Sequence, residues 1–303
     1  MYDVIVIGGG PAGLQAALTL GRLHRTTLLL DSGYYRNDPA SHMHNFITHD
    51  GTPPEEFRMA ARKDLSAYDT VEVLDDEVAK VATDGAGFVV ATTGGTSYDA
   101  RAVVLATGVR DTLPDIPGVD ALWGSVVAHC PFCHGHELAG GTVAVQGGPH
   151  APRLTAMMSR IAERLLVLAH DHPLTEDERA QVLLTGAEVV EGPITSVTPE
   201  GAGARIQVGD TSVHVDGFFV AGTIGQAAPF AEQLGLTLLP SGGIEVDAFG
   251  HTSMPRVYAA GDLAHQSVYP MPLASVLHAA AAGAMAAMGA IQDLLAEELT
   301  ATG

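Results

Sequence analysis

Two cysteines and two histidines stand close together in the stretch CPFCHGHE. Cys130 and Cys133 are the only cysteines of the 303-residue chain, and two residues separate them. This spacing lets two sulfurs form a disulfide or share a metal ion. His134 and His136 follow at once, and an imidazole accepts a thiol proton near neutral pH. The stretch therefore predicts thiol–disulfide chemistry or metal binding, with His134 as the first candidate for the base and His136 as the second.

A Cys2His2 zinc site is the alternative use of these four side chains. Zinc sites of that kind usually place about a dozen residues between the cysteine pair and the histidine pair. Four ligands within seven residues are hard to arrange as a tetrahedron, so no metal is expected. His42, His44 and His49 fit no helix face and no standard metal motif either.

The composition limits the expected partners and the compartment. The formal net charge is -20 and no run of Lys or Arg occurs, so neither nucleic acid nor an anionic membrane is an expected partner. Met1 precedes YDVIVIGGG, without the basic segment of a secretory signal. The stretch Ala279–Ile291 is too short and too weakly apolar to span a bilayer. We expect a cytoplasmic protein, in which a CxxC pair is redox-active or metal-binding rather than a structural staple.

The N-terminus shows the pattern of a dinucleotide site. Residues 2–7 read as a buried strand, a helix follows the glycines, and residues 26–31 read as a second buried strand that ends at Asp31. In the GxGxxG turn the glycines allow a tight bend, close approach of a pyrophosphate and packing of helix on strand, while Asp31 is expected to take ribose hydroxyls. The alternative is a glycine-rich turn that binds nothing. The expected cofactor contacts of this turn are Gly8, Gly10, Pro11, Ala12 and Gly13.

Two later strand ends are expected to meet the same cofactor. Residues 101–108 form a buried strand that ends in the small residues Ala106, Thr107 and Gly108. A strand over 257–260 runs into Gly261 and Asp262. That aspartate either reaches a ribityl chain or pyrophosphate, or simply caps the following helix, which is expected over 272–295.

A second strand, turn and helix unit interrupts the first fold. Residues 141–148 read as a strand and turn, 153–165 as a helix and 165–171 as a strand. We therefore predict an α/β protein with two Rossmann-like nucleotide-binding domains, the second inserted into the first. The expected outer domain covers residues 1–114 and 248–303, and the expected inserted domain, which carries the CxxC pair, covers 115–247.

The order of these motifs resembles that of thioredoxin reductase-like flavoproteins over essentially the whole chain. GGGPAG, LATG, the CxxC and TSMPRVYAAGD occur in the family's order. The stretches DSGYYRNDPASHMHNFITHDG and CPFCHGHE are similar to one branch, the dithiol oxidases of dithiol natural products such as gliotoxin and holomycin. The resemblance implies FAD in the outer domain, a nicotinamide site in the insert and a homodimer.

The resemblance also implies roles for single residues. Gly8, Gly10, Gly13 and Asp31 hold the ADP portion of FAD, and Asp262 holds its ribityl or pyrophosphate portion. Cys133 faces the flavin, and Cys130 is the thiol that meets the substrate. Thioredoxin reductases place an aspartate directly after the second cysteine, where this chain has His134. The loop with His42, His44 and His49 is expected beside the flavin, and its expected isoalloxazine contacts are Arg36 and Asn45.

The nicotinamide site is where the chain departs from the reductases. The turn of the second unit reads GGPHAP instead of GxGxxG or GxGxxA. Pro149 has no N–H for a phosphate, and Pro152 adds bulk where helix and strand should touch. AHDHPLTEDER follows the next strand, with two acids before Arg179, where NADPH-binding relatives carry arginines. An acid there, Asp171, suits NADH instead and leaves that option open.

Three functions are compatible with these features. An FAD-dependent dithiol oxidase would take electrons from a small-molecule dithiol and pass them to O2, which becomes hydrogen peroxide. A reductase of thioredoxin or a similar protein would need NAD(P)H or ferredoxin, and a flavin-bearing thiol sensor would turn over slowly or not at all. The oxidase needs only the motifs that are present, so it is the predicted function, in biosynthesis of a dithiol antibiotic, in self-resistance, or in both.

Overall fold

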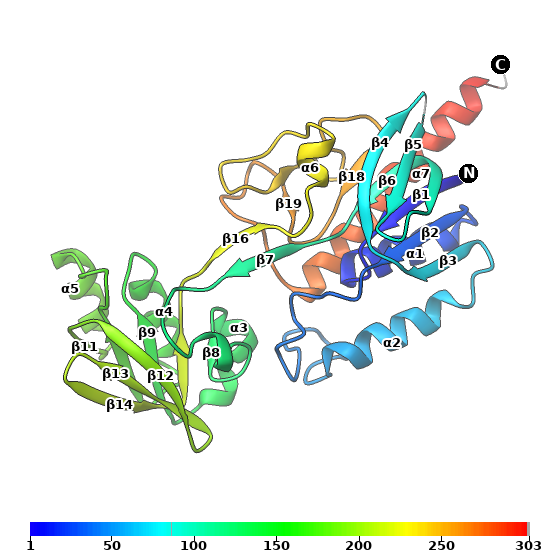
Figure 1. Cartoon of the computed structure of the whole chain (residues 1–303). Helices are drawn as coiled ribbons and strands as arrows, with labels where there is room; N and C mark the ends of the chain where they lie inside the picture. The colour runs from blue at the N-terminus through cyan, green and yellow to red at the C-terminus, as the bar shows by residue number, and fades with distance from the viewer. Residues whose placement is uncertain (86, 302–303) are drawn as a thin grey trace. The chain divides into compact units, whose positions relative to one another are not determined.

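The computed structural model describes residues 1–85 and 87–301, which divide into two compact units (Figure 1). Unit 1 comprises Met1–Arg36, Pro54–Arg110 and the chain from Ile224 onward. Unit 2 comprises Asn37–Pro53 and Asp111–Thr223. The second unit thus interrupts the first at two places in the sequence.

Unit 1 is built on a seven-stranded, mostly parallel sheet. Its central strand β1 pairs with β2 on one side and with β6 on the other, both parallel. Strand β18 extends the parallel part beside β6, whereas β4 and β5 form an antiparallel hairpin on the first half of β6. The described elements are β1 (Tyr2–Ile7), α1 (Pro11–Arg22), β2 (Thr27–Asp31), α2 (Pro54–Leu65), β3 (Val71–Asp75), β4 (Val78–Asp84), β5 (Gly87–Thr92), β6 (Ser97–Leu105), β7 (Val109–Thr112), β16 (Thr223–Gln226), α6 (Phe230–Gln233), β17 (Ile244–Glu245), β18 (Val257–Ala259), β19 (Ala264–His265) and α7 (Val276–Ala301).

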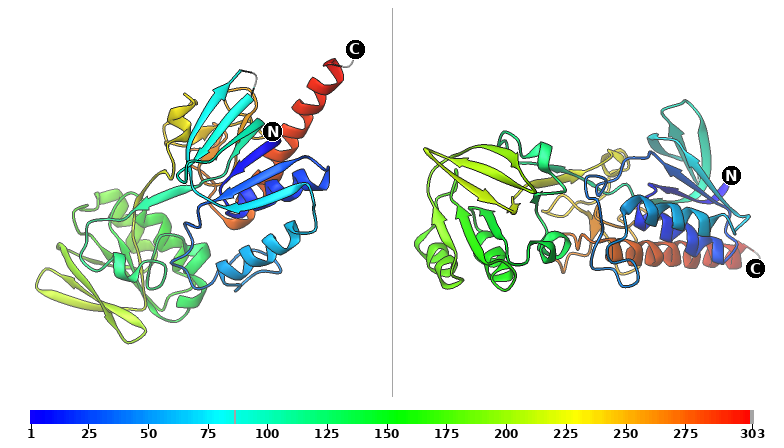
Figure 2. Two further views of the ribbon diagram at one scale, coloured as in Figure 1. Left: turned by 45° about the vertical axis from the view of Figure 1, so that its right-hand side comes forward. Right: turned by 90° about the horizontal axis from the view of Figure 1, so that it is seen from below.

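Successive side chains of β1 point to opposite faces of the sheet and therefore pack into two different cores. Val4 and Val6 face the core that α1 and α7 cover, while Ile5 and Ile7 face the core on the other side. This period of two is the pattern of a strand whose two faces are both buried. Figure 2 shows α1 and α7 running side by side against one face of the sheet.

Contact between α1 and α7 depends on a glycine at the crossing. A Cβ atom at Gly283 would collide with the Ala12 backbone oxygen. We expect Gly283→Ala to destabilise unit 1 by roughly 2 kcal/mol, because overpacking outweighs the better helix propensity of alanine. Thermal unfolding followed by circular dichroism measures the effect. Gly225→Ala is the matched control, since its Cβ would meet nothing within 4 Å, and an equal loss of stability in both variants would contradict the prediction.

Unit 2 contains a five-stranded parallel sheet and a three-stranded antiparallel sheet. The parallel strands lie in the order β11-β10-β9-β15-β8, and β12, β13 and β14 make the antiparallel sheet. The described elements are η1 (Asp120–Leu122), β8 (Val127–Ala128), α3 (Pro131–His134), η2 (His136–Leu138), β9 (Thr142–Gln146), α4 (Ala151–Met158), β10 (Arg164–Leu168), α5 (Glu176–Leu184), β11 (Glu188–Val190), β12 (Ile194–Glu200), β13 (Gly203–Val208), β14 (Thr211–Val215) and β15 (Gly217–Phe219). The helix expected over 153–165 corresponds to α4 (Ala151–Met158), which begins two residues earlier and ends seven residues earlier.

The compact units end at different residues from those expected for the domains. Residues 224–247 were expected in the insert but belong to unit 1, because Phe230, Leu234 and Ile244 pack into the same core as Ile5. Residues 37–53 were expected in the outer domain but belong to unit 2.

Helix α7 is longer than the apolar stretch recognised in the sequence. Val276–Thr300 is long enough to cross a membrane and has a mean hydropathy of 1.4 over its most apolar window, so the expectation that this region is too short was wrong. Length and apolarity alone are weak indications, because core helices share them. Here Ala286, Ala287 and Leu294 are fully buried in the core of unit 1.

Candidate redox and cofactor site

The glycine turn after β1 forms an open cradle at the start of α1. Gly8 has φ +115°, a conformation that favours glycine. Gly10 is the N-cap of α1 without a side-chain cap, and a Cβ atom there would meet nothing within 4 Å. The first N–H groups of a helix have no partner inside the helix, and together with the dipole they attract a phosphate. These residues fit the pyrophosphate of a dinucleotide.

The two other predicted turns lie beside this cradle. A Cβ atom at Gly8 would collide with the Ala106 backbone, so the turn at 106–108 touches the glycine turn directly. The Ala106 N–H donates to the Ile7 oxygen over 2.8 Å. Gly261, with φ +90°, approaches Ala12 so closely that its Cβ would lie 3.0 Å from the Ala12 Cβ. Unit 1 thus brings together the three turns that the sequence singled out.

Asp31 lies against the same cradle, with its carboxylate already engaged. A Cβ atom at Gly9 would collide with that carboxylate. The Asp31 oxygens accept hydrogen bonds from the Gly33 N–H over 3.0 Å, from the Tyr35 hydroxyl over 2.6 Å and from Arg62. From the sequence, Asp31 was expected to be available for ribose hydroxyls. In the structure, three protein donors hold it in place, and ribose contact stays a prediction.

Asp262 is paired with a cation from a distant part of unit 1. Arg36 donates from Nη1 to Asp262 Oδ2 over 2.7 Å, and both side chains are about one-fifth exposed. The sequence reading assigned both residues to the cofactor but did not foresee that they contact each other. This ion pair fixes Asp262 beside the turn at Gly261, and contact of either residue with a cofactor stays a prediction.

The two cysteines form a disulfide in unit 2. Their Cα atoms are 5.3 Å apart, a normal separation for a disulfide. Cys130 is the N-cap of the short helix α3, and Cys133 lies within that helix. The backbone N–H groups of Cys133 and His134 both donate to the Cys130 oxygen, over 3.1 and 3.2 Å. Both sulfurs are thus held as a disulfide, and no group of three or more potential ligands among the described residues is arranged for a metal ion.

His134 is held as a neutral imidazole with one nitrogen unused. The Gly124 carbonyl accepts a hydrogen bond from the ring, and Nδ1 is buried without a partner among the described residues, so Nε2 is the donor. This bond selects the tautomer in which Nδ1 carries a lone pair. Burial lowers the pKa of His134, an effect that His44 adds to and that the Gly124 carbonyl and Glu137 oppose. His134 therefore has the properties of a base at neutral pH.

Gly124 links this base to the 37–53 segment. It has φ +83°, and a Cβ atom there would lie 2.6 Å from Pro39 atoms, including the backbone oxygen. Its N–H donates to the Val127 oxygen over 2.9 Å, which sets the turn that presents its carbonyl to His134. The close contact with Pro39 is one reason why residues 37–53 belong to unit 2.

The remaining histidines of this region differ from His134 in exposure. His136 is exposed on η2, which suits contact with a ligand or with solvent. The ring of His129, also exposed, stacks on Trp123 with centroids 5.4 Å apart. Asn45, expected at the flavin, is an exposed residue of unit 2 whose N–H donates to Asp50 Oδ1 over 2.7 Å. Its flavin contact stays a prediction.

The second nucleotide turn is filled by its own histidine. His150 lies over the turn, because a Cβ atom at Gly148 would be 3.1 Å from its Cε1 and Nδ1. The ring donates a hydrogen bond to the Gln146 carbonyl, and Nε2 is buried without a partner among the described residues. Burial, together with His172, lowers the pKa of His150 although the Gln146 carbonyl opposes it. Pro152 occupies the first turn of α4.

These features agree with comparisons to known proteins. The family model for pyridine nucleotide-disulphide oxidoreductases matches residues 2–286. The chain belongs to this family. It is 34% identical to thioredoxin reductase sirT of Leptosphaeria maculans over 99% of this chain and 97% of the relative.

Solved structures of related oxidoreductases have the same fold. An oxidoreductase from Agrobacterium tumefaciens is 33% identical, with a TM-score of 0.89 over 97% of this chain and 98% of the other. The crystal structure of HlmI is 33% identical, with a TM-score of 0.91 over 99% of this chain and 95% of the other. The prediction of two Rossmann-like domains, the second inserted into the first, is confirmed.

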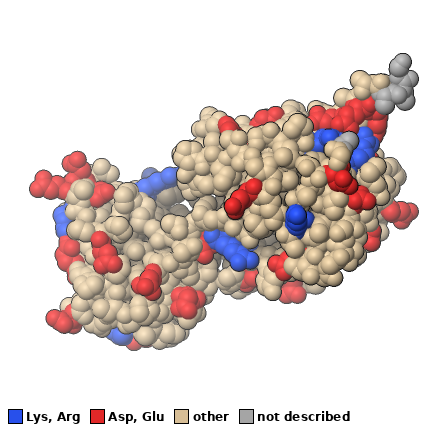
Figure 3. All heavy atoms as spheres, turned by 45° about the horizontal axis from the view of Figure 1, so that its top comes forward, with Lys and Arg blue, Asp and Glu red and all other residues tan. Residues whose placement is uncertain are grey.

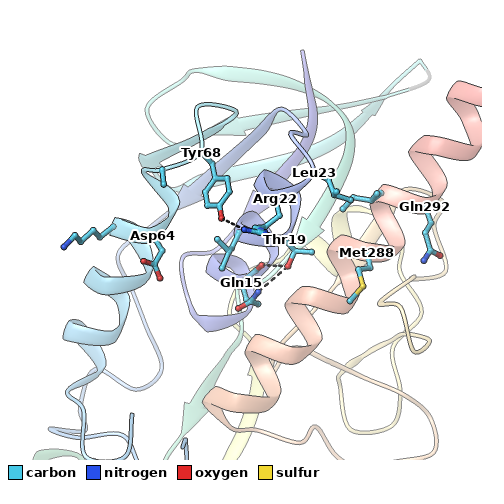
Figure 4. A pocket seen from close by; sticks show the side chains of 12 residues that line it. Gln15, Thr19, Arg22, Leu23, Asp64, Tyr68, Met288 and Gln292 are labelled. Atoms are coloured by element: carbon cyan, nitrogen blue, oxygen red, sulfur yellow. Dashed lines mark hydrogen bonds between the residues drawn. The ribbon is translucent and has the colours of Figure 1, made fainter. Parts of the chain in front are cut away.

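A depression of unit 1 is lined by none of the residues of the three cofactor turns. It has a volume of about 900 Å³ and lies among α1, α2 and α7 (Figure 4). Arg22 donates to the Tyr68 hydroxyl at its rim over 3.4 Å. Its lining contains no cysteine and no histidine, so it offers no thiol or imidazole for the redox chemistry. The lining residues are Gln15, Leu18, Thr19, Arg22, Leu23, Lys63, Asp64, Ala67, Tyr68, Met288, Ile291 and Gln292.

The charge of the surface shown in Figure 3 is mostly acidic. Acidic side chains outnumber basic ones on the face in Figure 3, and the basic side chains there are scattered rather than joined in a patch. Such a surface offers no continuous cationic stripe for a nucleic acid or an acidic protein on this face.

Several residues of the site escaped the sequence reading. Gly124 acts through its contact with His134, ten positions along the chain, whereas Glu137 and His150 act on residues of their own motifs. The only local signal was the glycine after Trp123, because a positive φ is a common reason for a glycine in a turn. The pairing of Arg36 with Asp262 spans 226 positions and has no local signal.

Proposed function

We propose that the chain is an FAD-dependent dithiol oxidase, which closes an intramolecular disulfide in a small-molecule dithiol. The net reaction joins two thiol sulfurs of the substrate and reduces O2 to hydrogen peroxide, so two electrons and two protons pass from one to the other. FAD held in unit 1 would supply the two-electron chemistry that links the protein dithiol to dioxygen. The relevant cofactor residues are those of the three turns around Gly8, Ala106 and Gly261.

The contrast between the two nucleotide turns carries this proposal. In unit 1 the cradle at Gly10 is open. In unit 2 the His150 ring lies over Gly148, and Pro149 has no N–H to offer a phosphate. A productive nicotinamide site would have to displace that ring. Electrons are therefore better supplied by the dithiol than by NADH or NADPH.

The cysteines and His134 perform the exchange. A substrate thiolate attacks the Cys130 sulfur, and Cys133 leaves as a thiolate. The second substrate sulfur then attacks the first, which releases the cyclic disulfide and leaves Cys130 reduced. A proton from the substrate thiols passes to His134 Nδ1, which lacks a partner in the disulfide form. Because this nitrogen is covered there, the transfer requires α3 to move when the disulfide opens.

Anaerobic mixing of the flavin-loaded protein with separate reductants tests the proposal. We expect a small uncharged dithiol to bleach the flavin absorbance within seconds, and air to restore it with one hydrogen peroxide per dithiol oxidised. NADH and NADPH should bleach it at least about a hundredfold more slowly, because each decade of rate reflects about 1.4 kcal/mol of lost stabilisation. Rapid bleaching by a nicotinamide would make the chain a reductase instead.

A variant of the second turn makes the same test sharper. A triple variant restores the glycine and small-residue pattern of a nucleotide turn. It combines Pro149→Gly, His150→Ala and Pro152→Ala. We expect this triple variant to gain measurable NADH or NADPH binding while its reaction with the dithiol stays unchanged. The homodimer and a role in biosynthesis or self-protection are part of the same proposal and rest on the family resemblance, whereas the cytoplasmic location rests on the sequence features given above.

A further inference from the structure

Asp31, the acid at the end of β2, is covered by other residues of unit 1. Its side chain is only 1% exposed. Oδ1 accepts a hydrogen bond from the Gly33 N–H, and Oδ2 accepts one from the Tyr35 hydroxyl and another from Arg62. A carboxylate oxygen has two lone pairs, so these two donors saturate Oδ2. Asp31 therefore lacks the exposed acceptor oxygens with which an acid at this position binds a ribose diol.

Arg62 of α2 is the exposed partner in this ion pair. Its side chain is 30% exposed, and Nη2 also donates to Asp75 Oδ1 over 2.6 Å. A guanidinium carries five N–H groups, and within residues 1–85 and 87–301 only Nη2 of Arg62 has an acceptor. Nε and Nη1 thus retain N–H groups for the oxygen of a ligand. The end of β2 presents hydrogen-bond donors where an acid would present acceptors.

The other charged groups beside this pair also favour an anion. Arg58 precedes Arg62 by four positions on α2, so the two side chains lie on the same face of the helix. The Arg58 Cζ lies 3.8 Å from the centroid of the Tyr35 ring, whose hydroxyl donates to Asp31. Asp75 is 77% exposed, and solvent therefore screens most of its charge. The buried charge of Asp31 is already balanced by Arg62.

We propose that Arg62 is the ribose contact of the unit 1 cofactor site and that Asp31 is a positioning residue that fixes its guanidinium. This assignment replaces the direct Asp31 contact expected from the sequence, and it rests on the proposed binding of FAD. In dinucleotide turns an acid at this position binds ribose hydroxyls, whereas an arginine nearby accommodates a 2′-phosphate. The site should therefore accept a phosphate on the 2′ oxygen of the adenosine, although β2 ends in an acid.

Competition against FAD by two probes that differ only in this phosphate tests the proposal. The probes are ADP-ribose and 2′-phospho-ADP-ribose, and flavin fluorescence follows the release of FAD from the full chain. We expect their inhibition constants to agree within about threefold in the wild type, because the charges that face the phosphate are paired or exposed. Arg62→Gln leaves the Asp31 charge unpaired and should weaken the phosphorylated probe by at least about tenfold relative to the other.

Two further variants of unit 1 sharpen the comparison. Asp75→Asn removes the exposed partner of Arg62 and should shift the ratio of the two constants by about threefold in favour of the phosphorylated probe. Lys63→Gln is the matched control, because it removes the neighbouring positive charge of α2, which lines the depression among α1, α2 and α7 instead. Its ratio should equal that of the wild type. The ratio within one variant cancels any general loss of affinity for nucleotides.

Opposite shifts in Arg62→Gln and Asp75→Asn, with none in Lys63→Gln, support the proposal. Rejection of the phosphorylated probe by the wild type, or equal ratios in wild type and Arg62→Gln, overturns it. If Arg62→Gln does not fold, the ratio in Asp75→Asn decides, and an unchanged ratio overturns the assignment. FAD binding without dithiol oxidation would refute only the proposed oxidase, whereas a chain that binds no FAD would refute both.

Discussion

Cys133→Ser is expected to abolish dithiol-dependent bleaching of the flavin, with a loss of at least about a thousandfold, as for removal of a nucleophile from a covalent mechanism. The variant keeps Cys130 as a free thiol but has no disulfide for the substrate to reduce. Serine cannot replace the sulfur, because it forms no disulfide and passes on no electron pair. The measurement is the anaerobic stopped-flow rate with a small dithiol.

A second readout separates the roles of the two cysteines. With a substrate supplied as an activated mixed disulfide, Cys133→Ser should form a stable adduct at Cys130, visible as added mass in the intact protein. In Cys130→Ser, Cys133 should form this adduct much more slowly if it is the sulfur turned to the flavin. Faster adduct formation at Cys133 than at Cys130 would reverse the two assignments.

His134→Gln is expected to slow reduction of the protein disulfide by about a hundredfold, the lower end of the usual range for a general base. Glutamine can still reach the Gly124 carbonyl with its amide but cannot accept a thiol proton. His136→Gln is the natural control, because His136 is exposed and no side-chain hydrogen bond joins it to the residues that the structure describes. We expect it to slow the reaction less than about fivefold.

The pH dependence provides an independent check on His134. Burial lowers the pKa of this histidine below its ordinary value of 6.5, so the base is already neutral at pH 7. The proton-accepting contribution of His134 should therefore be flat near neutrality and fall only below pH 6.5. His134→Gln should lose this acid limb, and an acid limb that persists in His134→Gln but disappears in His136→Gln would transfer the role to His136.

The same shift gives a stability prediction of definite sign. Below pH 6.5 the unfolded chain protonates this histidine while the folded protein resists doing so. Unfolding then takes up a proton, and the free energy of unfolding falls as the pH falls through this window. Denaturant unfolding of wild type and His134→Gln, compared at pH 7 and pH 5.5, should show a smaller loss in the variant.

Local patterns were sufficient for the parts of the fold that depend on neighbours in sequence. The glycines at 8, 10 and 13 sit between a strand of period two and a helix, and each has a steric reason that does not depend on the rest of the chain. The strand ends at Ala106 and Gly261 were recognised in the same way. Their meeting beside Gly8 follows from parallel pairing with β1, which a Rossmann order already implies.

Contacts between distant segments were not predictable from such patterns. Phe230 and Leu234 would look equally apolar in either core, so the end of the insert was placed too late. His134 and His136 have the same chemistry and are two positions apart, and they are distinguished by burial of the His134 ring and by its hydrogen bond to the Gly124 carbonyl. The His150 ring lies over Gly148 because of the conformation of its side chain, which a sequence pattern does not specify. The sequence indicated only that Pro149 and Pro152 disturb this turn.

The division of unit 2 between two stretches of chain limits how its chemistry can be moved to other proteins. A fragment of residues 111–223 contains both cysteines and every strand of the two sheets in that unit. It lacks Pro39, which buttresses Gly124, and His44, which pairs with Glu137. A graft of the continuous fragment would therefore carry the disulfide without the groups that prepare its base. A transplantable version must join residue 53 to residue 111 by a new linker, which keeps the two stretches in their native order.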